Sequence, residues 1–282
     1  MKCGIDADVL VYELGFSSQY IDEDTEELVI MDFDFAAELL DQRIREIEEE
    51  CWADQPSTLY LTNDPTLNKI VNRKRKSLGK KPLKYKENFR VEVAKSKEYK
   101  GQRSGEKPFH RDNLRAYMLD KYEVKIANGL EADDLLCIDG HKNPDFTICT
   151  RDKDLRMVEG RHYGWPCGKQ PQFGPKDVDY IGAIELHKKD IKGWGIKFFY
   201  SQMITGDKVD NIGGLPRGGP ALAYSLLADL EDEESMAKAV TEKYEEKLGE
   251  GWKDYYEEQA KLLWMIKETD SKGEPIMWST YG

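Results

Sequence analysis

Groups of acidic residues recur at the ends of short apolar segments, and this pattern limits what the chain can fold into more than any other feature. The groups are Asp6 and Asp8 in GIDADVLVY, Asp64 after LYLTN, Glu131, Asp133 and Asp134 in GLEADDLLC, Asp152 and Asp154 in ICTRDKDL, and Asp207 and Asp210 in TGDKVDN. Most lie where a β-like run ends or a helix-like run begins, which is where an α/β sheet presents residues to its ligand crevice. Carboxylates gathered there would repel one another unless divalent cations lay among them. The pattern therefore predicts a site for hard metal ions that act on phosphate.

The order of the apolar segments predicts an α/β fold with a mainly parallel central sheet flanked by helices. Short apolar runs predict strands at 3–6, 59–62, 124–127 and 146–150, and apolar periodicity predicts helices at 34–50, 111–121, from 131 onward and at 253–267. Strands that alternate with helices imply parallel pairing. After about residue 195 the chain changes to helices and glycine-rich turns. We therefore expect an α/β part at 1–195 and a helical part at 196–282.

The composition is that of a globular protein. The chain has 282 residues, of which 39% are hydrophobic, and no apolar stretch approaches the 18 residues or so that a transmembrane helix needs. The N-terminal MKCGIDADVL is typical of a buried first strand and lacks the features of a signal peptide. The five cysteines are scattered, and Cys3, Cys137 and Cys149 lie in apolar runs. This favours core thiols in a reducing cytoplasm, where we expect the protein to be, over zinc ligands.

Charge is strongly segregated along the chain. The formal net charge is −12, yet residues 69–111 hold sixteen Lys and Arg against four acids, a local charge of +12 that leaves −24 for the rest. Such segregation favours a basic element beside an acidic site. Tyr85, Phe89, Tyr99 and Phe109 interrupt the basic segment, and bases or sugars can stack on aromatic rings. The alternative is a solvated lysine-rich loop with no partner.

Spacing within the acidic groups predicts which carboxylates act together. Asp152 and Asp154 are two residues apart at a strand exit, so an extended backbone would point both to one side. Asp207 and Asp210 are three apart, as are Glu131 and Asp134, and a helix would place each pair on one face. Any single pair has a plainer interpretation, because acids are common in the first turn of a helix.

A glycine-rich segment, GDKVDNIGGLPRGGPALA at 206–223, is the second distinctive feature. Gly213, Gly214, Gly218 and Gly219 would let the backbone approach another chain closely, and a helix is expected to begin near Pro220 with exposed amides. A helix–turn–helix element of this kind grips a phosphate backbone without reading bases. An ordinary glycine-rich loop is the alternative, although it would not explain the acidic pair that precedes it.

Four motifs, taken together and in order, resemble those of the 5′-nuclease family, which includes phage flap endonucleases, phage 5′→3′ exonucleases and the 5′-nuclease domain of bacterial DNA polymerase I. They are YKxxR at 99–103, EADD at 131–134, TxDKDL at 150–155 and GDxxDNIxGxPxxGPxxA at 206–223, and the likeness spans nearly the whole chain. It implies a PIN-like 5′-nuclease fold with a basic helical arch at 69–111 and a helix-three-turn-helix region around the loop at 206–223.

The resemblance also implies roles for particular residues. Its metal-binding acids correspond to Asp6, Asp64, Glu131, Asp133, Asp134, Asp152, Asp154, Asp207 and Asp210. Lys100 and Arg103 correspond to arch cations that act on the scissile phosphate, with Asp6, Asp152 and Asp154 as the other catalytic residues. The residues expected to bind DNA are Gly213, Gly214, Arg217, Gly218 and Gly219 in the loop, and Arg73, Lys74, Arg75 and Lys76 early in the basic segment.

The activity implied is 5′→3′ exonuclease or structure-specific flap endonuclease cleavage of DNA, by a two-metal mechanism, in phage DNA replication or recombination. The expected cofactors are two Mg²⁺, with Mn²⁺ able to substitute, and a K⁺ ion at the glycine-rich loop. The expected partner is duplex DNA with a 5′ end, a flap or an RNA/DNA hybrid, and we expect a monomer with no membrane association, in the host cytoplasm if the chain is phage-encoded.

The chain departs from the family pattern in the loop. Gly213 stands where proline is usual, Arg217 and Gly218 replace a glycine–aliphatic pair, and Ala221 replaces a lysine. Two other functions remain open. One is a binding protein that keeps the loop and has lost catalysis, which the intact acidic groups disfavour. The other is a two-metal phosphatase or an RNA-degrading toxin, which would usually lack the basic arch and the glycine-rich loop.

Overall fold

The computed structural model describes residues 1–102 and 105–279, and they form two compact units. The sheet unit comprises Met1–Asn88, Gly105–Asp152 and Arg161–Lys176, and the helical unit comprises Phe89–Ser104, Lys153–Gly160 and Asp177–Gly282. The chain thus passes between the units more than once, and no single break in the sequence separates them. The boundary expected after residue 195 stays a prediction.

Six strands form the main sheet, and its core is parallel as predicted. They are β1 (Lys2–Asp6), β4 (Thr58–Thr62), β5 (Glu123–Ala127), β6 (Phe146–Cys149), β7 (Gly160–Gly164) and β8 (Phe173–Val178), in the order β5-β4-β1-β6-β7-β8. β1 pairs in parallel with β4 on one side, where Ile5 is opposite Leu59, and with β6 on the other, where Ile5 is opposite Cys149. The chain order therefore reverses at β1, which makes the carboxyl end of β1 the switch point where α/β proteins bind ligands.

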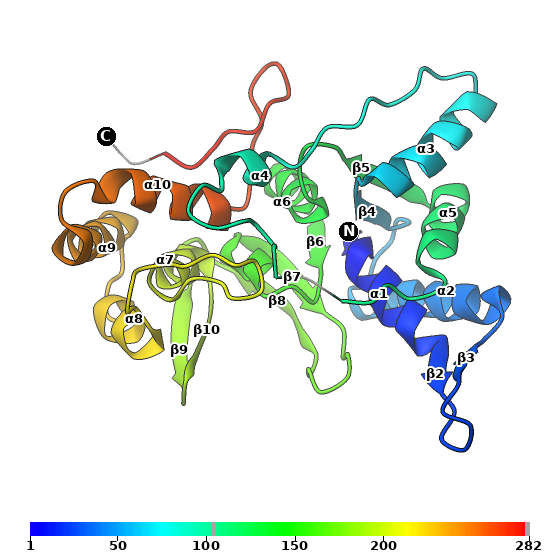
Figure 1. Cartoon of the computed structure of the whole chain (residues 1–282), viewed down its shortest axis with the longest axis horizontal. Coiled ribbons are helices and arrows are strands. Elements are labelled where there is room, and N and C mark those ends of the chain that lie inside the picture. Colours follow the sequence, from blue (N-terminus) through cyan, green and yellow to red (C-terminus); the bar gives the residue numbers. More distant parts are fainter. Residues whose placement is uncertain (103–104, 280–282) are drawn as a thin grey trace. The chain divides into compact units, whose positions relative to one another are not determined.

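Helices cover both faces of this sheet (Figure 1). They are α1 (Ala7–Ser17), α2 (Phe33–Glu50), α3 (Pro65–Ser77), α5 (Arg111–Lys121) and α6 (Ala132–Lys142), and a small hairpin of β2 (Gln19–Ile21) and β3 (Leu28–Ile30) follows α1. α6 contacts β1, β4, β5 and β6, whereas α1, α2 and α5 contact one another over the opposite face.

The alternation of side chains along β1 separates these two faces. Cys3 and Ile5 point into the main core with residues of α1 and α2, because side chains alternate along a strand. Gly4 points the other way, under α6. A Cβ added at Gly4 would lie 2.1 Å from the ring of Phe146 and 2.6 Å from Leu136. The missing side chain at this position therefore lets α6 and Phe146 pack directly on the central strand.

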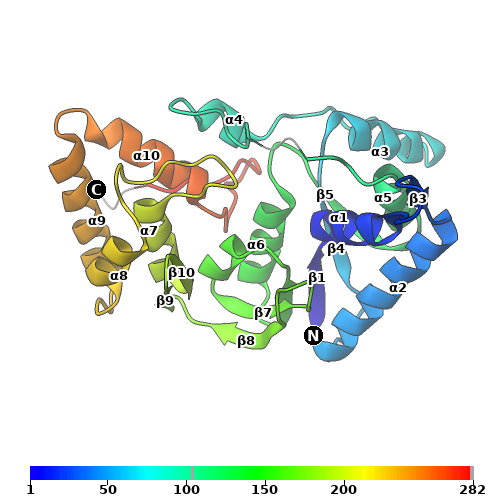
Figure 2. The same cartoon turned by 60° about the horizontal axis from the view of Figure 1, so that its bottom comes forward.

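The helical unit is built around a buried helix. Its elements are α4 (Phe89–Val93), the 3₁₀ helix η1 (Asp154–Met157), the antiparallel hairpin of β9 (Ala183–His187) and β10 (Asp190–Trp194), and helices α7 (Gly195–Thr205), α8 (Pro220–Leu227), α9 (Glu233–Leu248) and α10 (Trp252–Leu263). α7 is buried along almost its whole length and contacts α8, α9, α10 and the hairpin. Figure 2 shows the same elements from a second direction. The predicted change to helices after residue 195 is confirmed.

One end of α10 is closed by a buried arginine from α4. Arg90 is fully buried, and its guanidinium donates to the carbonyls of Leu262, at 3.1 Å, and Trp264, at 2.7 Å. The last carbonyls of a helix have no partner within the helix, so Arg90 supplies one from a distant part of the sequence. The predicted helix at 253–267 therefore ends at Leu263, with Trp264 in an extended conformation.

The basic segment at 69–111 packs against the rest of the protein at several points. Its first part belongs to α3, which Asp64 caps and which buries Leu67 and Val71 one turn apart. Arg90 and His110 are also buried. These parts of the basic segment therefore pack against the core. Within residues 1–102 and 105–279, no helix is both long and apolar enough to cross a membrane.

We expect Gly4→Ala to destabilise the protein by about 1–3 kcal/mol, the usual cost of overpacking a core. The new methyl group would have to displace Phe146 or Leu136. Gly105→Ala is the matched control, because a Cβ there meets no atom within 4 Å. Urea unfolding measures both changes, and equal stability of the two variants would contradict this account of β1.

Candidate active site

Asp6 lies at the centre of the acidic site in the sheet unit. It ends β1 and caps α1, where its Oδ1 accepts from the backbone N–H of Val9 at 3.3 Å. Its Oδ2 accepts from the hydroxyl of Thr150, which follows β6, at 2.8 Å. Only 2% of the residue is exposed. Burial, and then the charges of Asp8 and Asp152, raise the pKa of Asp6 to about 7.

Asp8 joins the site from the first turn of α1. Its Oδ2 accepts from the backbone N–H of Thr62 at 2.9 Å, at the carboxyl end of β4. Its Oδ1 is buried, accepts no hydrogen bond within the described part of the chain, and lies 3.7 Å from the guanidinium of Arg115. Burial raises the pKa of Asp8 in spite of that guanidinium. Asp6 and Asp8 are thus two carboxylates held where neither ionises easily.

Asp64 lies near the same end of the sheet, and both of its carboxylate oxygens already accept hydrogen bonds. Its Oδ1 accepts from the backbone N–H groups of Thr66 and Leu67, at 2.9 and 2.8 Å, and its Oδ2 accepts from Arg111 and Arg115, at 2.5 and 2.7 Å. Although burial acts to raise the pKa of Asp64, Leu67 and the two guanidinium groups lower it far below its ordinary value. These four donors account for the position of Asp64 as a helix cap and an ion-pair partner.

Glu131, Asp133 and Asp134 lie at the start of α6. Glu131 is the N-cap and Asp134 the third helical residue, and they form a reciprocal capping box in which Asp134 accepts from the backbone N–H of Glu131 at 3.0 Å. Asn88 donates to Oε1 of Glu131 at 2.9 Å. Both capping carboxylates are buried. The predicted pairing of Glu131 with Asp134 thus arises from the cap, and not from one face of a helix.

Asp152 and Asp154 do not share one side of an extended strand. The backbone N–H of Asp152 donates to the hydroxyl of Thr150 at 2.9 Å, and the next residue, Lys153, has helical angles of φ −67 and ψ −27. Asp154 begins η1 and accepts from Gln202 of α7 at 2.6 Å. β6 ends at Cys149, so side-chain alternation no longer applies here. Asp152 belongs to the sheet unit and Asp154 to the helical unit.

Asp207 and Asp210 lie in a tight turn between α7 and α8, and not on a helix. Asp207 forms an isolated β-bridge with Ile212, and its Oδ1 accepts from the backbone N–H groups of Val209 and Asp210, at 2.7 and 3.3 Å. Its Oδ2 accepts from Lys153 at 2.9 Å. Although burial acts to raise the pKa of Asp207, Lys153 and these backbone donors lower it. The turn, closed by its own hydrogen bonds, replaces the predicted helical turn.

The predicted arch lysine lies against this turn. Nζ of Lys100 is 3.7 Å from Oδ2 of Asp210, and its backbone N–H donates to the carbonyl of Asp210 at 3.0 Å. The hydroxyl of Tyr99 donates to the same Asp210 carboxylate at 3.0 Å. Lys100 has a positive φ of 56°. In the helical unit, Asp210 is thus paired with a lysine, as Asp207 is with Lys153. Arg103 lies outside the described residues.

The glycine-rich loop uses most of its glycines for its own packing. A Cβ at Gly214 would lie 2.2 Å from the backbone of Gly206, and one at Gly218 would lie 2.2 Å from the carbonyl of Ile204. At Gly213 it would lie 2.6 Å from the hydroxyl of Tyr255. Gly219, the N-cap of α8, has open space around its Cβ position. Arg217 precedes it, exposed and with φ at 59°.

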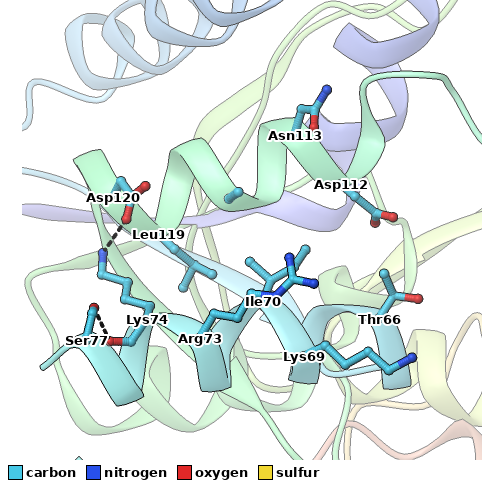
Figure 3. Close-up of a pocket in the computed structure, with 11 residues that line it drawn as sticks. Thr66, Lys69, Ile70, Arg73, Lys74, Ser77, Asp112, Asn113, Leu119 and Asp120 are labelled. Carbon is cyan, nitrogen blue, oxygen red and sulfur yellow. Dashed lines mark hydrogen bonds and ion pairs between the residues drawn. The ribbon is translucent and has the colours of Figure 1, made fainter. Parts of the chain in front are cut away.

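A groove between α3 and α5 carries part of the predicted DNA-binding set (Figure 3). Lys69, Arg73 and Lys74 line it from α3, and Asp120 of α5 forms an ion pair with Lys74 at 3.2 Å. The groove has a volume of ≈ 520 Å³. Arg75 instead donates to the carbonyl of Lys81 at 2.7 Å. Of the four predicted cations, Arg73 and Lys74 therefore face the groove.

Sequence reasoning missed several polar residues that hold the acids in place. Thr150 donates to Asp6, and Lys153 donates to Asp207. Both residues belong to the TRDKDL motif, so the sequence did carry a signal for them. Arg111 and Arg115 hold Asp64, and their only signal is a four-residue spacing at a helix start. Such a spacing is common on exposed helices, so it could not have identified them.

We expect the melting temperature of the protein in EDTA to fall as the pH rises from 5 to 8, with a contribution from Asp6. The pKa of Asp6 is about 7 in the folded state, above that of about 3.9 in an unfolded chain. The folded state then binds this proton more tightly, and the stabilisation is lost as the pH rises through 7. Asp6→Asn should flatten the profile and raise the melting temperature at pH 8. Thermal melts at unit pH steps measure this, and parallel profiles for both proteins would contradict it.

Comparison with known proteins gives one relative in sequence and several in structure. No family model matches the chain. The chain is 31% identical over 140 residues to DNA polymerase I of Rhizobium leguminosarum, a match that covers 47% of this chain and 12% of the polymerase. The chain thus spans about an eighth of that relative's length.

Among solved structures, the T5 5′-exonuclease with bound zinc has a TM-score of 0.50 and 14% identity, over 93% of this chain and 88% of that chain. The bacteriophage T5 D15 flap endonuclease, solved with DNA and metal ions, has a TM-score of 0.47 and 13% identity, over 93% and 98%. The first of these likenesses establishes the fold. The chain is similar in fold to a 5′-exonuclease and in part of its sequence to a DNA polymerase I, so the resemblance to the 5′-nuclease family that its motifs indicate is confirmed.

Proposed function

We propose that the chain is a metal-dependent 5′-nuclease that hydrolyses DNA phosphodiester bonds at 5′ ends or flaps. The observation that carries the proposal is the buried Asp6 and the half-buried Asp8, whose Oδ1 is buried, at the switch point of a parallel sheet, beside Asp152 and the capping pair of α6. The similarity to the T5 5′-exonuclease supports it, since that protein has been solved with divalent metal ions.

The donor set fits a hard divalent cation. The site in the sheet unit offers carboxylate oxygens, the donors that Mg²⁺ prefers. Oδ1 of Asp8 is a buried acceptor that no hydrogen bond satisfies within the described residues, and burial and the charge of Asp8 raise the pKa of Asp6 to about 7. A cation would satisfy the first and displace the proton from the second. In the helical unit, Lys153 and Lys100 provide positive charge to Asp207 and Asp210.

Each unit would contribute its own ligands. In the sheet unit the proposed ligands are Asp6, Asp8, Glu131, Asp133, Asp134 and Asp152, and in the helical unit they are Asp154, Asp207 and Asp210. Asp64 is left out, because four donors already engage its oxygens. Two bound Mg²⁺ ions would polarise the scissile phosphate, activate a water and neutralise the leaving 3′-oxygen. Mn²⁺ is the proposed substitute.

Other side chains of the protein would hold the proposed ligands and the scissile phosphate in position. Thr150 donates to the carboxylate of Asp6 and accepts from the backbone N–H of Asp152, so one hydroxyl holds the Asp6 side chain and the Asp152 backbone. Gln202 fixes Asp154 in the same way. Lys100 would bind the scissile phosphate and offset negative charge in the transition state, the role of a preplaced cation. Its backbone contact with Asp210 holds it beside the carboxylates of the helical unit.

DNA binding would rest on contacts to phosphate. Arg73 and Lys74 in the α3–α5 groove, with Arg75 and Lys76 at the end of α3, supply positive charge. The exposed N-terminus of α8 at Gly219 and the neighbouring Arg217 supply a second contact, through backbone amides and a guanidinium. A K⁺ ion at this loop, a monomeric state and a role in phage replication or recombination complete the proposal.

A cleavage assay tests the proposal against its two alternatives. The substrates are 5′-labelled duplex DNA, a 5′ flap and single-stranded RNA, each with Mg²⁺ and with EDTA. We expect Mg²⁺-dependent cleavage of the DNA substrates. Binding of DNA without cleavage would favour a protein that has lost catalysis, and cleavage of the RNA alone would favour an RNA-degrading toxin.

We expect Asp152→Asn and Asp154→Asn to abolish hydrolysis while duplex binding survives. Each variant removes one ligand charge, whereas binding rests on the cations and the loop. Asp145→Asn is the matched control, since Asp145 is an exposed acid before the opposite end of β6. Cleavage rates and DNA affinity are measured in parallel, and near-parental rates in both variants would refute these assignments.

Lys100→Ala should lower the single-turnover rate at saturating DNA by about 10²–10³, as for other electrostatic catalytic groups. Lys100→Arg, which keeps the charge, should recover part of the loss. Lys107→Ala is the control for the loss of one positive charge, because Lys107 is an exposed cation of the same basic segment. Weaker binding with an unchanged saturated rate would show that Lys100 has no catalytic role.

Replacing Arg73, Lys74, Arg75 and Lys76 together by alanine should make the salt dependence of duplex binding shallower. Each lost phosphate contact reduces the slope of log K against log salt by about 0.9. Two of the four cations already have partners in Asp120 and the carbonyl of Lys81, so we expect a reduction of about 2 rather than 4. The control changes Lys188, Lys189 and Lys192 of the β9–β10 hairpin, which should leave the slope unchanged.

A further inference from the structure

Three cysteines that are far apart in the sequence meet in the core of the sheet unit. Cys3 lies in β1, Cys51 ends α2 and Cys149 lies in β6. Each is 0% exposed. Their three Sγ atoms all lie within 4.8 Å of one another, and those of Cys51 and Cys149 are 3.8 Å apart. The core therefore contains a compact group of three thiols, here called the thiol cluster.

We propose that the thiol cluster binds one soft, thiophilic metal cation, with Cu(I) as the preferred ion. Thiolate sulfurs bind such an ion at about 2.3 Å, so two sulfurs on one ion are about 3.8–4.0 Å apart in tetrahedral or trigonal geometry. The separation of Cys51 and Cys149 already has this value. Only a small shift of Cys3 would complete a three-sulfur site.

The number of ligands decides between soft ions. Among the described residues, the group has three ligands and no neighbouring His, Asp or Glu within the same distance. Structural zinc takes four ligands almost without exception, whereas thiolates select Cu(I) among the other soft ions. Hard ions such as Mg²⁺ prefer oxygen. The thiol cluster would therefore discriminate against the ion proposed for the carboxylates.

The surroundings favour thiolate over thiol at one position. Hydrogen bonds from Cys149 and Cys51 lower the pKa of Cys3 to about 4, and the N-terminal ammonium and Arg161 act in the same direction. Burial raises the pKa of Cys149 well above its ordinary value. A metal ion would release the remaining thiol protons to the solvent, which makes binding dependent on pH.

The three cysteines of the cluster are free thiols. Because the three residues come from β1, β6 and α2, one bound ion would link the two central strands to the helix that covers them. The thiols lie on the α2 face of the sheet, and Thr150, which holds Asp6, directly follows Cys149.

Native mass spectrometry of the full chain tests the proposal. The reduced protein is incubated with buffered Cu(I), and in parallel arms with Zn²⁺ or Cd²⁺, at saturating Mg²⁺. Because the sulfurs are buried, each arm is repeated with the metal present during refolding from denaturant. We expect one Cu(I) per chain, a thiolate-to-metal absorption band, and a melting temperature higher by about 5–10 °C at a hundredfold excess over the dissociation constant.

Cysteine variants assign the site. Cys3→Ser, Cys51→Ser and Cys149→Ser should each lose the bound ion and the absorption band. Cys137→Ser is the control, since Cys137 is equally buried but lies in α6 outside the cluster, and it should bind Cu(I) normally. Where a variant fails to fold, thiol labelling of the parent protein in denaturant replaces it, and Cu(I) should slow the labelling of three of its five cysteines.

Four results would overturn the proposal. They are the absence of stoichiometric Cu(I) in both the native and the refolded protein, retention of the ion by Cys51→Ser, loss of the ion in Cys137→Ser, and binding of one Zn²⁺ in preference to Cu(I). These measurements do not require nuclease activity, so a failure of this proposal can be distinguished from a failure of the proposed function.

Discussion

The burial of Asp6 at the carboxyl end of β1 is the constraint on which the site depends. A carboxylate kept away from water resists ionisation, and Asp8 and Asp152 increase that resistance. The fold holds Asp6 in place by hydrogen bonds from Thr150 and from the start of α1, on either side of the switch point. Core packing around β1 thus supports a group whose charge is unfavourable in the folded state. Under the proposed function, a bound cation would relieve this cost, so stability and metal affinity would be opposed at Asp6.

Several acidic residues of the site are also helix caps. Asp6 caps α1, Asp64 caps α3, and Glu131 with Asp134 caps α6. A cap at the carboxyl end of a parallel strand is both a local structural signal and a ligand position, because the strand end and the helix start coincide there. This explains why acidic residues at helix starts had two valid interpretations from sequence. Asp64 accepts from four donors, which account for its position as a cap and an ion-pair partner.

The sequence was sufficient for features with local signals. The strands at β1, β4, β5 and β6 and the parallel sheet followed from apolar runs that alternate with helical periodicity, and α2 and α5 followed from spacing alone. Features that depend on contacts between distant residues could not be predicted from the sequence. The turn at Asp207 depends on a bridge to Ile212 and an ion pair with Lys153, and the meeting of Cys3, Cys51 and Cys149 depends on strand order. Scattered cysteines carry no pairwise signal, so the sequence favoured the simpler interpretation of isolated core thiols.

The contact of Arg90 with the end of α10 has a consequence for the architecture of the basic segment. A buried guanidinium that donates to the carbonyls of Leu262 and Trp264 ties the segment to the last helix of the chain at one point. Removing α10 would leave that charge in the core without its acceptors, at a high cost in stability. A deletion within α10 would therefore disturb the packing of Arg90 and its neighbours without changing one residue of the basic segment.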